Sequence, residues 1–131
     1  MSVTTSPASD ARRALGAAGE RCAAEYLARR GYRVVARNAR AGGVELDLIA
    51  LRGGVYVFVE VKTRRGPGRG AAEEAVDARK RERLVRGARA WLHARRAAHL
   101  RARFDVIAVA ALRGGGYELR HWPGAIDAGD V

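Results

Sequence analysis

The chain has 131 residues, and its 25 basic against 14 acidic side chains give a formal net charge of +11. This length predicts one domain, placed at residues 9–122 between a disordered tail over 1–8 and a C-terminal tail over 123–131. The single cysteine excludes an intramolecular disulfide and a thiolate zinc cluster. No stretch reaches 18 apolar residues, so we expect a cytoplasmic protein with no membrane partner. The positive charge favours a polyanion such as nucleic acid over a neutral metabolite.

The first expected element is a helix over about 9–30, closed by Gly31. Glu20 lies at the edge of its apolar stripe, where a carboxylate is unusual, and is expected to point toward the sheet. A strand over 32–37 and a turn region over 38–43 follow.

Two β-type runs, 44–52 and 55–62, flank the dipeptide Gly53-Gly54, which suits a two-residue hairpin turn. The second run is apolar on both faces up to Val61, which predicts a central strand covered on each side.

A turn centred on the glycine pair makes opposed residue numbers sum to 107. Asp47 then faces Glu60 and Glu45 faces Lys62, with all four side chains on one face of the sheet. Two carboxylates opposed in this way repel by about 3 kcal/mol at an effective dielectric near 20. Either a cation lies between them, or one of them holds a proton.

A glycine-rich loop over 66–70 precedes a long expected helix over about 72–99, on which Lys80 faces inward. Strands over 103–109 and 117–121 complete the chain. The expected order α, β, β, β, α, β, β predicts a mixed sheet with helices on both faces. The buried face of the second helix is expected to contain Val76, Leu84, Ala88 and Trp91.

Only two of the 25 basic residues are lysines, Lys62 and Lys80. Lysine is a compact charge whose pKa shifts readily, unlike arginine, so its rarity suggests positions where its chemistry matters. His93, His99 and His121 lack a paired metal-ligand spacing and are predicted to be surface residues.

Three carboxylates, Glu20, Asp47 and Glu60, are expected to converge beside Lys62. An acidic spot in a basic protein is what metal-assisted phosphodiester chemistry requires, because carboxylates hold Mg²⁺ or Mn²⁺ while arginines hold phosphates. Lys62 could orient the attacking water, and Glu45 could join the site or simply pair with Lys62.

A solvent-facing charge ladder is the structural alternative for this hairpin. Ile49, Tyr56 and Phe58 share the same face and argue for a partly covered surface.

Phosphate contacts are expected from Arg64, Arg65 and Arg69 on the glycine-rich loop, and from Lys80. The outward arginines of the second helix, Arg79, Arg83 and Arg86, would contribute in the same way. The sequence leaves open whether the protein forms a homodimer.

An Asp followed after a hairpin by Glu-x-Lys resembles the PD-(D/E)xK nuclease superfamily, and more closely the YraN family of small bacterial proteins related to archaeal Holliday junction resolvases. The likeness rests on these segments: Gly16-Ala17-Ala18-Gly19-Glu20 with Ala23 and Tyr26-Leu27, Asn38-Ala39-Arg40, Glu45-Leu46-Asp47-Leu48-Ile49, Phe58-Val59-Glu60-Val61-Lys62-Thr63-Arg64, Ala75-Val76 with Lys80, and Arg103-Phe104-Asp105-Val106. Val44 departs from the family, which usually has Gly before the Glu.

The resemblance implies a restriction-endonuclease-like αβββαβ core, an α/β fold. In it Asp47 and Glu60 would ligate a divalent metal, Lys62 would serve the water or transition state, and Glu20 would complete the site. The expected function is a Mg²⁺- or Mn²⁺-dependent endonuclease acting on DNA, with branched or structured DNA as a candidate substrate. The alternative is a non-catalytic nucleic-acid-binding module with the same fold.

Overall fold

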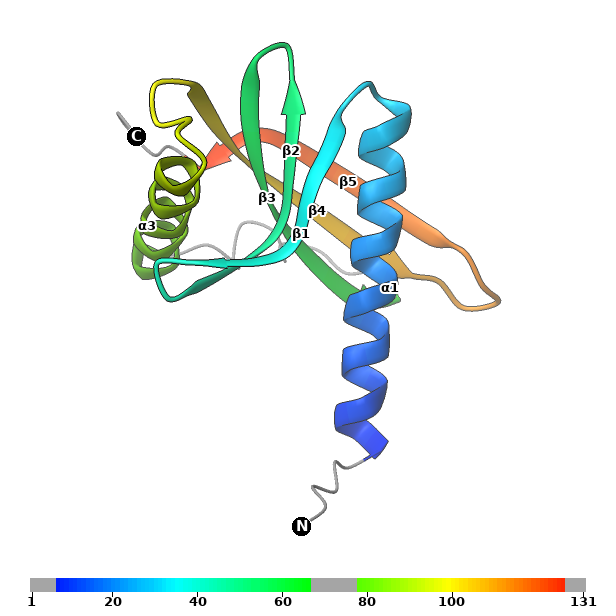
Figure 1. Ribbon diagram of the computed structural model, residues 1–131. Helices are drawn as coiled ribbons and strands as arrows, with labels where there is room; N and C mark the ends of the chain where they lie inside the picture. Colours follow the sequence, from blue (N-terminus) through cyan, green and yellow to red (C-terminus); the bar gives the residue numbers. More distant parts are fainter. Residues whose placement is uncertain (1–6, 67–77, 127–131) are drawn as a thin grey trace.

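A computed structural model describes residues 7–66 and 78–126 of the chain (Figure 1). The described elements follow one another in the predicted order. They are α1 (Pro7–Arg29), β1 (Arg33–Ala41), β2 (Val44–Arg52), β3 (Val55–Arg65), α3 (Ala78–Ala94), β4 (Arg101–Ala111) and β5 (Tyr117–Ile126).

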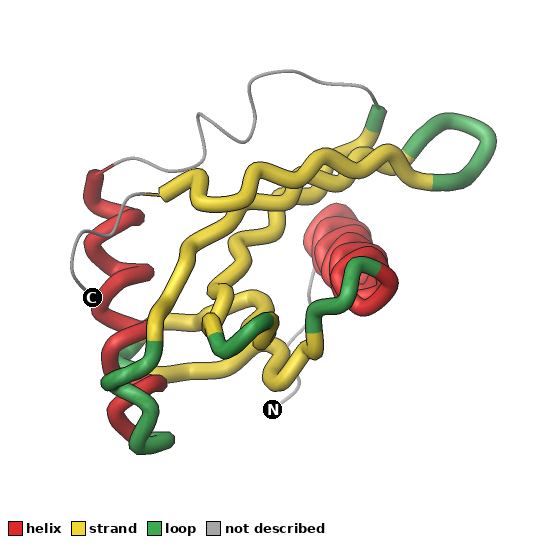
Figure 2. The backbone as a smooth tube through the Cα atoms, turned by 90° about the horizontal axis from the view of Figure 1, so that it is seen from above, coloured by secondary structure: helices red, strands yellow, loops and turns green. Residues whose placement is uncertain are grey.

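The five strands form one mixed sheet in the order β1-β2-β3-β4-β5. Only β3 and β4 pair in parallel, and the other neighbours are antiparallel. The helix α1 covers one face of the sheet and α3 covers the other (Figure 2). This arrangement confirms the predicted α/β class and is consistent with a restriction-endonuclease-like fold.

Two apolar layers hold the helices, one on each face of the sheet. The layer under α3 contains Val44, Leu46, Ile49, Phe58, Leu84, Ala88, Trp91, Leu92, Ala97, Phe104, Val106 and Ile126. The layer under α1 contains Ala23, Ala24, Leu27, Tyr32, Leu48, Ala50, Val57, Val59, Val61, Ile107 and Val109. The central strand β3 contributes to both layers, which explains why its sequence is apolar on both faces.

The β2–β3 hairpin has the predicted turn. Gly53 and Gly54 have φ values of +56° and +77°, as a two-residue turn with two left-handed residues requires. The register runs from Arg52 opposite Val55 to Leu48 opposite Val59, so opposed residue numbers sum to 107 as expected.

The turn region predicted over 38–43 is wrong in extent. The strand β1 continues to Ala41, and only Gly42 and Gly43 form the turn. Asn38 suggested a turn, and it does adopt a left-handed φ of +48°, but the β1–β2 pairing resumes beyond it. Near the turn that joins them, β1 and β2 bend together toward α3 (Figure 1).

The bend changes which side chains of β2 face each helix. Leu48 and Ala50 lie in the layer under α1, whereas Leu46 and Val44 lie in the layer under α3. Strict alternation would place all four together. Asp47, which lies between Leu46 and Leu48, is therefore the residue at which the side-chain alternation of β2 is interrupted.

The second helix ends earlier than predicted. It is described from Ala78, so Val76 lies outside the described residues, and it ends at Ala94 instead of near residue 99. Arg96 has a left-handed φ of +56°, its N–H donates to the carbonyl of His93, and the Ala97 N–H donates to that of Leu92. This pair of hydrogen bonds is a Schellman motif.

Two smaller corrections concern strand ends. The last strand does not stop at residue 121 but runs to Ile126, so the predicted C-terminal tail begins too early. The strand β5 includes Pro123 because it lies at the edge of the sheet, where a missing N–H is tolerated. Arg64 and Arg65 belong to β3 and not to the glycine-rich loop.

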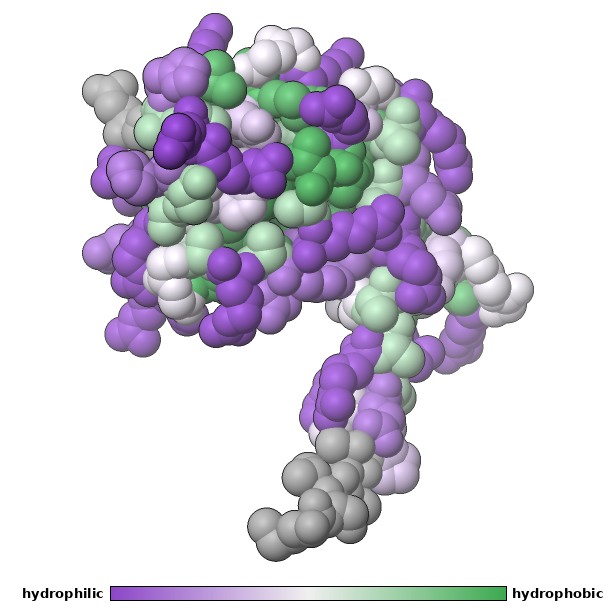
Figure 3. All heavy atoms as spheres, in the orientation of Figure 1, coloured by the Kyte–Doolittle hydropathy of each residue, from purple (hydrophilic) through white to green (hydrophobic). Residues whose placement is uncertain are grey.

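The first helix extends beyond the sheet (Figures 1 and 3). At 23 residues it is about 34 Å long. Its buried residues are Gly19, Ala23, Ala24 and Leu27, all in its second half. The second half of α1 therefore fixes its position on the sheet.

Candidate functional site

The site lies where β2 separates from β3. Their pairing is described only as far as Leu48 and Val59. Beyond this point the Asp47 Oδ2 accepts a hydrogen bond from the backbone N–H of Val61, at 2.9 Å. The carboxylate thus takes the place that a backbone carbonyl of β2 would have held in a continued ladder.

Asp47 lies beside Glu60, as predicted, and the two carboxyl groups interact. Burial and, to a smaller extent, the charge of Glu60 together raise the pKa of Asp47 to about 7, although the hydrogen bond from Val61 opposes the shift. Asp47 therefore holds a proton for much of the time near neutral pH, and a proton on one acid is one of the two solutions expected from the sequence.

Two lysines, Lys62 and Lys80, lie beside the carboxyl groups of Asp47 and Glu60. Lys80 Nζ is 2.7 Å from Glu60 Oε1, and Glu60 is only 9% exposed. Burial alone would lower the pKa of Lys80, but its interactions with Glu60 and its hydrogen bond with Lys62 outweigh this effect and raise the pKa. A hydrogen bond with Lys80, together with burial, lowers the pKa of Lys62. The prediction that Lys80 faces inward is confirmed.

Glu20 approaches this group from α1. Gly19 allows the approach, because a Cβ at that position would lie 1.9 Å from Thr63 Oγ1. Burial raises the pKa of Glu20 while a hydrogen bond with Asn38 opposes the shift. Its charge also raises the pKa of Asp47, so the two groups are near each other.

Among residues 7–66 and 78–126, no three Asp, Glu, His or Cys side chains lie close enough together to hold a metal ion. The structure thus places Asp47 and Glu60 side by side and leaves Glu20 at the margin.

Glu45 is not opposite Lys62, and this prediction is wrong. Its cross-strand partner is Arg40 on β1, and their side chains form an exposed ion pair of 3.7 Å. The reason is the bend at Asp47, which ends the regular alternation on which the prediction depended.

A hollow of about 400 Å³ opens over the two carboxylates. One wall is acidic and comes from β2 and β3, and the other is basic and comes from α3. Its described lining consists of Val44, Glu45, Asp47, Glu60, Arg79, Lys80, Arg83 and Leu84.

The other predicted phosphate contacts have different places. Arg64 is partly buried and Arg65 is exposed at the end of β3, while Arg69 lies outside the described residues. Arg86 donates to the carbonyl of Gly42, at 3.2 Å.

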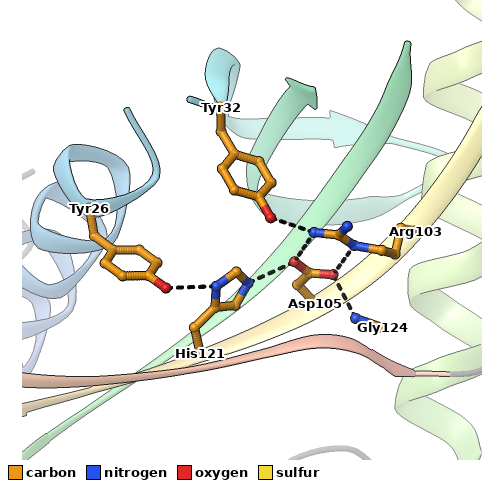
Figure 4. Close-up of polar contacts among 6 residues, drawn as sticks. All are labelled: Tyr26, Tyr32, Arg103, Asp105, His121 and Gly124. Carbon is orange, nitrogen blue, oxygen red and sulfur yellow. Dashed lines mark hydrogen bonds and ion pairs between the residues drawn. The ribbon is translucent and has the colours of Figure 1, made fainter. Parts of the chain in front are cut away.

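A second polar cluster was missed by the sequence reasoning (Figure 4). Asp105 is fully buried, and its carboxylate accepts hydrogen bonds from Arg103 at 2.8 and 2.9 Å and from the Gly124 N–H at 2.9 Å. His121 Nε2 lies 2.7 Å from the same carboxylate, and the His121 side chain is only 8% exposed. The prediction of a surface histidine is therefore wrong for His121.

Two tyrosines extend this cluster to α1. The Tyr26 hydroxyl lies 3.0 Å from His121 Nδ1, and the Tyr32 hydroxyl accepts a hydrogen bond from Arg103 at 2.7 Å. The cluster joins the end of α1 to β4 and β5 and leaves none of its buried side-chain polar atoms unpaired. An acidic residue within the apolar run of β4 was the available signal, since a buried carboxylate needs partners.

No described helix is long and apolar enough to cross a membrane.

Comparison with known proteins places this chain in a defined family. Residues 19–109 match the model of "Uncharacterised protein family UPF0102". A UPF0102 protein of Syntrophotalea carbinolica is 47% identical over 116 residues, which cover 88% of this chain and 94% of that protein. One of Nitratidesulfovibrio vulgaris is 48% identical over 118 residues, 90% of this chain and 87% of that protein.

A UPF0102 protein of Symbiobacterium thermophilum is 52% identical over 97 residues, 74% of this chain and 82% of that protein. The region matched by the family model, residues 19–109, contains Glu20, Asp47, Glu60, Lys62 and Lys80. On these matches, the chain belongs to the UPF0102, or YraN, family.

Proposed function

We propose that this protein is a divalent-metal-dependent endonuclease that hydrolyses phosphodiester bonds in DNA. The observation that carries the proposal is the pair Asp47 and Glu60, two adjacent carboxyl groups that share a hollow with a wall of cations. Branched or otherwise structured DNA is the first substrate class to test.

The donor set fits Mg²⁺ or Mn²⁺. Both ions prefer carboxylate oxygens, and Mg²⁺ is usually held by only one or two carboxylates together with water and substrate phosphate. Asp47 and Glu60 would supply these oxygens, so a preassembled set of three is not required. The pKa of about 7 for Asp47 is also compatible with metal binding, because a nearby dication would favour the ionised form of this carboxyl group. Such an ion polarises a phosphoryl oxygen and lowers the pKa of bound water.

The chain's own residues would position the substrate and move protons. Arg79 and Arg83 line the hollow from α3 and would hold phosphates of the strand to be cut. The lowered pKa of Lys62 suits a group that orients the attacking water or donates to the phosphate. Glu20 would hold a water at the edge of the site through its partly buried carboxyl group.

A cleavage assay tests the proposal. Duplex, single-stranded, flap and four-way-junction DNA should be incubated with purified protein and Mg²⁺ or Mn²⁺, with EDTA as the control. We expect metal-dependent nicking of at least one substrate. Asp47→Asn and Glu60→Gln should abolish it while DNA binding persists, since both variants keep the shape of the side chain and remove its charge. Equal cleavage by the variants and the parent would indicate a contaminating nuclease.

A second candidate is a non-catalytic nucleic-acid-binding module. The ion pair of Lys80 with Glu60 favours it, because this contact satisfies the buried carboxylate without a metal. Titration with Mn²⁺ separates the two functions. Binding of Mn²⁺ that disappears in Asp47→Asn supports the enzyme, whereas salt-sensitive DNA binding without any metal affinity supports the module.

A further inference from the structure

The chain's only two lysines meet at the acidic pair. Lys80 Nζ lies 2.7 Å from Glu60 Oε1, with side-chain exposures of 30% for the lysine and 10% for the glutamate. Lys62 in turn shares a hydrogen bond with Lys80. With 23 arginines elsewhere, both small, flexible cations of the chain occupy this one site.

A metal ion and Lys80 would compete for the same oxygen. Glu60 is almost completely buried, so its carboxylate has little access to water and depends on the cation that is present. An ammonium group at hydrogen-bonding distance already compensates its charge. A dication held by Asp47 and Glu60 would repel that ammonium group strongly, because both cations would depend on the Glu60 carboxylate.

The hollow can accept the ammonium group of Lys80 when it is displaced from Glu60. It lies in the first described turn of α3 and lines the hollow together with Arg79 and Arg83. Its side chain carries four flexible methylene groups, so rotation about them moves the ammonium group from Glu60 into the hollow without a backbone shift. The hollow is also where a substrate phosphate would lie.

We propose that Lys80 is an exchangeable counterion: it neutralises Glu60 while the site holds no metal, and metal binding displaces it toward the phosphate side of the hollow. This inference rests on the proposed function, since it requires that Asp47 and Glu60 bind a divalent ion. It gives Lys80 a positioning role in which the same charge first stabilises the acidic pair and then becomes available to the substrate.

Metal affinity in the absence of DNA tests the proposal. Mn²⁺ binding is measured by calorimetry for the parent chain, for Lys80→Met and for Arg83→Met. The two variants remove one positive charge from the same wall, but only Lys80 contacts Glu60 in the described structure. Both should bind Mn²⁺ more tightly than the parent. Lys80→Met should exceed Arg83→Met by about tenfold or more, the usual effect of a hydrogen bond to a charged group.

The outcomes separate this inference from the proposed function. If the parent binds Mn²⁺ but Lys80→Met gains no more than Arg83→Met, Lys80 acts only through general charge and the exchange is refuted. If none of the three proteins binds Mn²⁺, the metal site itself is refuted and the exchange with it.

A second measurement needs no substitution and therefore no assumption about folding. Amine acylation of the parent chain is followed by peptide mass spectrometry with and without saturating Mn²⁺. The modification rate of Lys80 should rise several-fold with Mn²⁺, because the ammonium group leaves Glu60. The α-amino group serves as the internal control and should not respond. An unchanged rate at Lys80, in protein shown to bind Mn²⁺, contradicts the exchange.

Discussion

Substitution of Gly19 tests how closely α1 must approach the sheet. A Cβ at this position would lie 1.9 Å from Thr63 Oγ1, 2.7 Å from its Cγ2 and 2.8 Å from its Cβ. Rotation of the threonine side chain cannot relieve the last contact, so Gly19→Ala must move the helix away from β3. Overpacking of this kind costs up to about 3 kcal/mol. Replacing a glycine inside a helix by alanine returns about 1 kcal/mol, so the net loss should be about 2 kcal/mol.

Gly16 provides the matched control, three residues earlier on the same helix. A Cβ there would meet nothing within 4 Å. Gly16→Ala should therefore stabilise the protein by up to about 1 kcal/mol through helix propensity alone. With an unfolding entropy of about 0.28 kcal/mol/K for 131 residues, Gly19→Ala should lower Tm by about 7 °C and Gly16→Ala should raise it by about 4 °C.

Thermal unfolding followed by circular dichroism measures both shifts. The double variant Gly19→Ala with Thr63→Ala should recover part of the loss, since two of the three short contacts disappear. Glu20 is the next residue, so Gly19→Ala should also reduce any metal-dependent nicking, measured well below Tm. If the two alanine variants agree within about 0.5 kcal/mol, which is the usual scatter of a neutral surface change, the close approach of α1 and β3 is not real.

Three further predictions concern the two polar clusters. The pKa of Asp47 is raised from 3.8 to about 7, so the stability that its neutral form provides is complete below pH 4 and is lost as the pH rises through 7. Urea unfolding in EDTA should show Asp47→Asn gaining up to about 4 kcal/mol over the parent between these limits, and parallel pH profiles would disprove the shift. Because metal binding requires the ionised carboxylate, Mn²⁺ affinity should rise up to about tenfold per pH unit below pH 7 and level off above it, as calorimetry can show. Asp105→Asn should cost about 3 to 5 kcal/mol by breaking a buried charge network, whereas Glu118→Gln in an exposed pair should change thermal stability by less than about 0.5 kcal/mol; similar values for both would mean that the buried network is not a major source of stability.

Glycine determined how far the fold could be predicted. Gly31 closes α1 with hydrogen bonds from Gly31 and Tyr32 to the last turn, and the pair Gly53-Gly54 fixed the register of the central hairpin. The end of α3 has the same hydrogen-bond pattern, but its left-handed residue is Arg96. An arginine gives no indication in the sequence that a helix ends there. A left-handed backbone position can be predicted from the sequence where it is occupied by glycine. It cannot be predicted where tertiary contacts impose the same conformation on another residue.

The sequence predicted the central pair of the candidate site, Asp47 and Glu60, but not the positions of Glu45 and His121. The pairing of Asp47 with Glu60 follows from a local turn, since the two positions are thirteen residues apart in the chain and the side-chain period is fixed. Glu45 was misplaced because the bend in β2 depends on packing of Leu46 against α3, a contact distant in sequence. His121 was misread for the same reason, because its partner Asp105 lies on a neighbouring strand and nothing near His121 indicates burial.

The hydrogen bond from Val61 to Asp47 limits which residues position 47 can accept. Alanine there would leave a backbone amide at the strand junction without its acceptor, so loss of cleavage in such a variant would combine a damaged sheet with a missing acid. Glutamate is one methylene longer and would push its carboxyl group out of the junction. Asparagine preserves the acceptor and removes only the ionisable oxygen. The architecture of the strand thus permits two residue types at this position, and only one of them can carry charge.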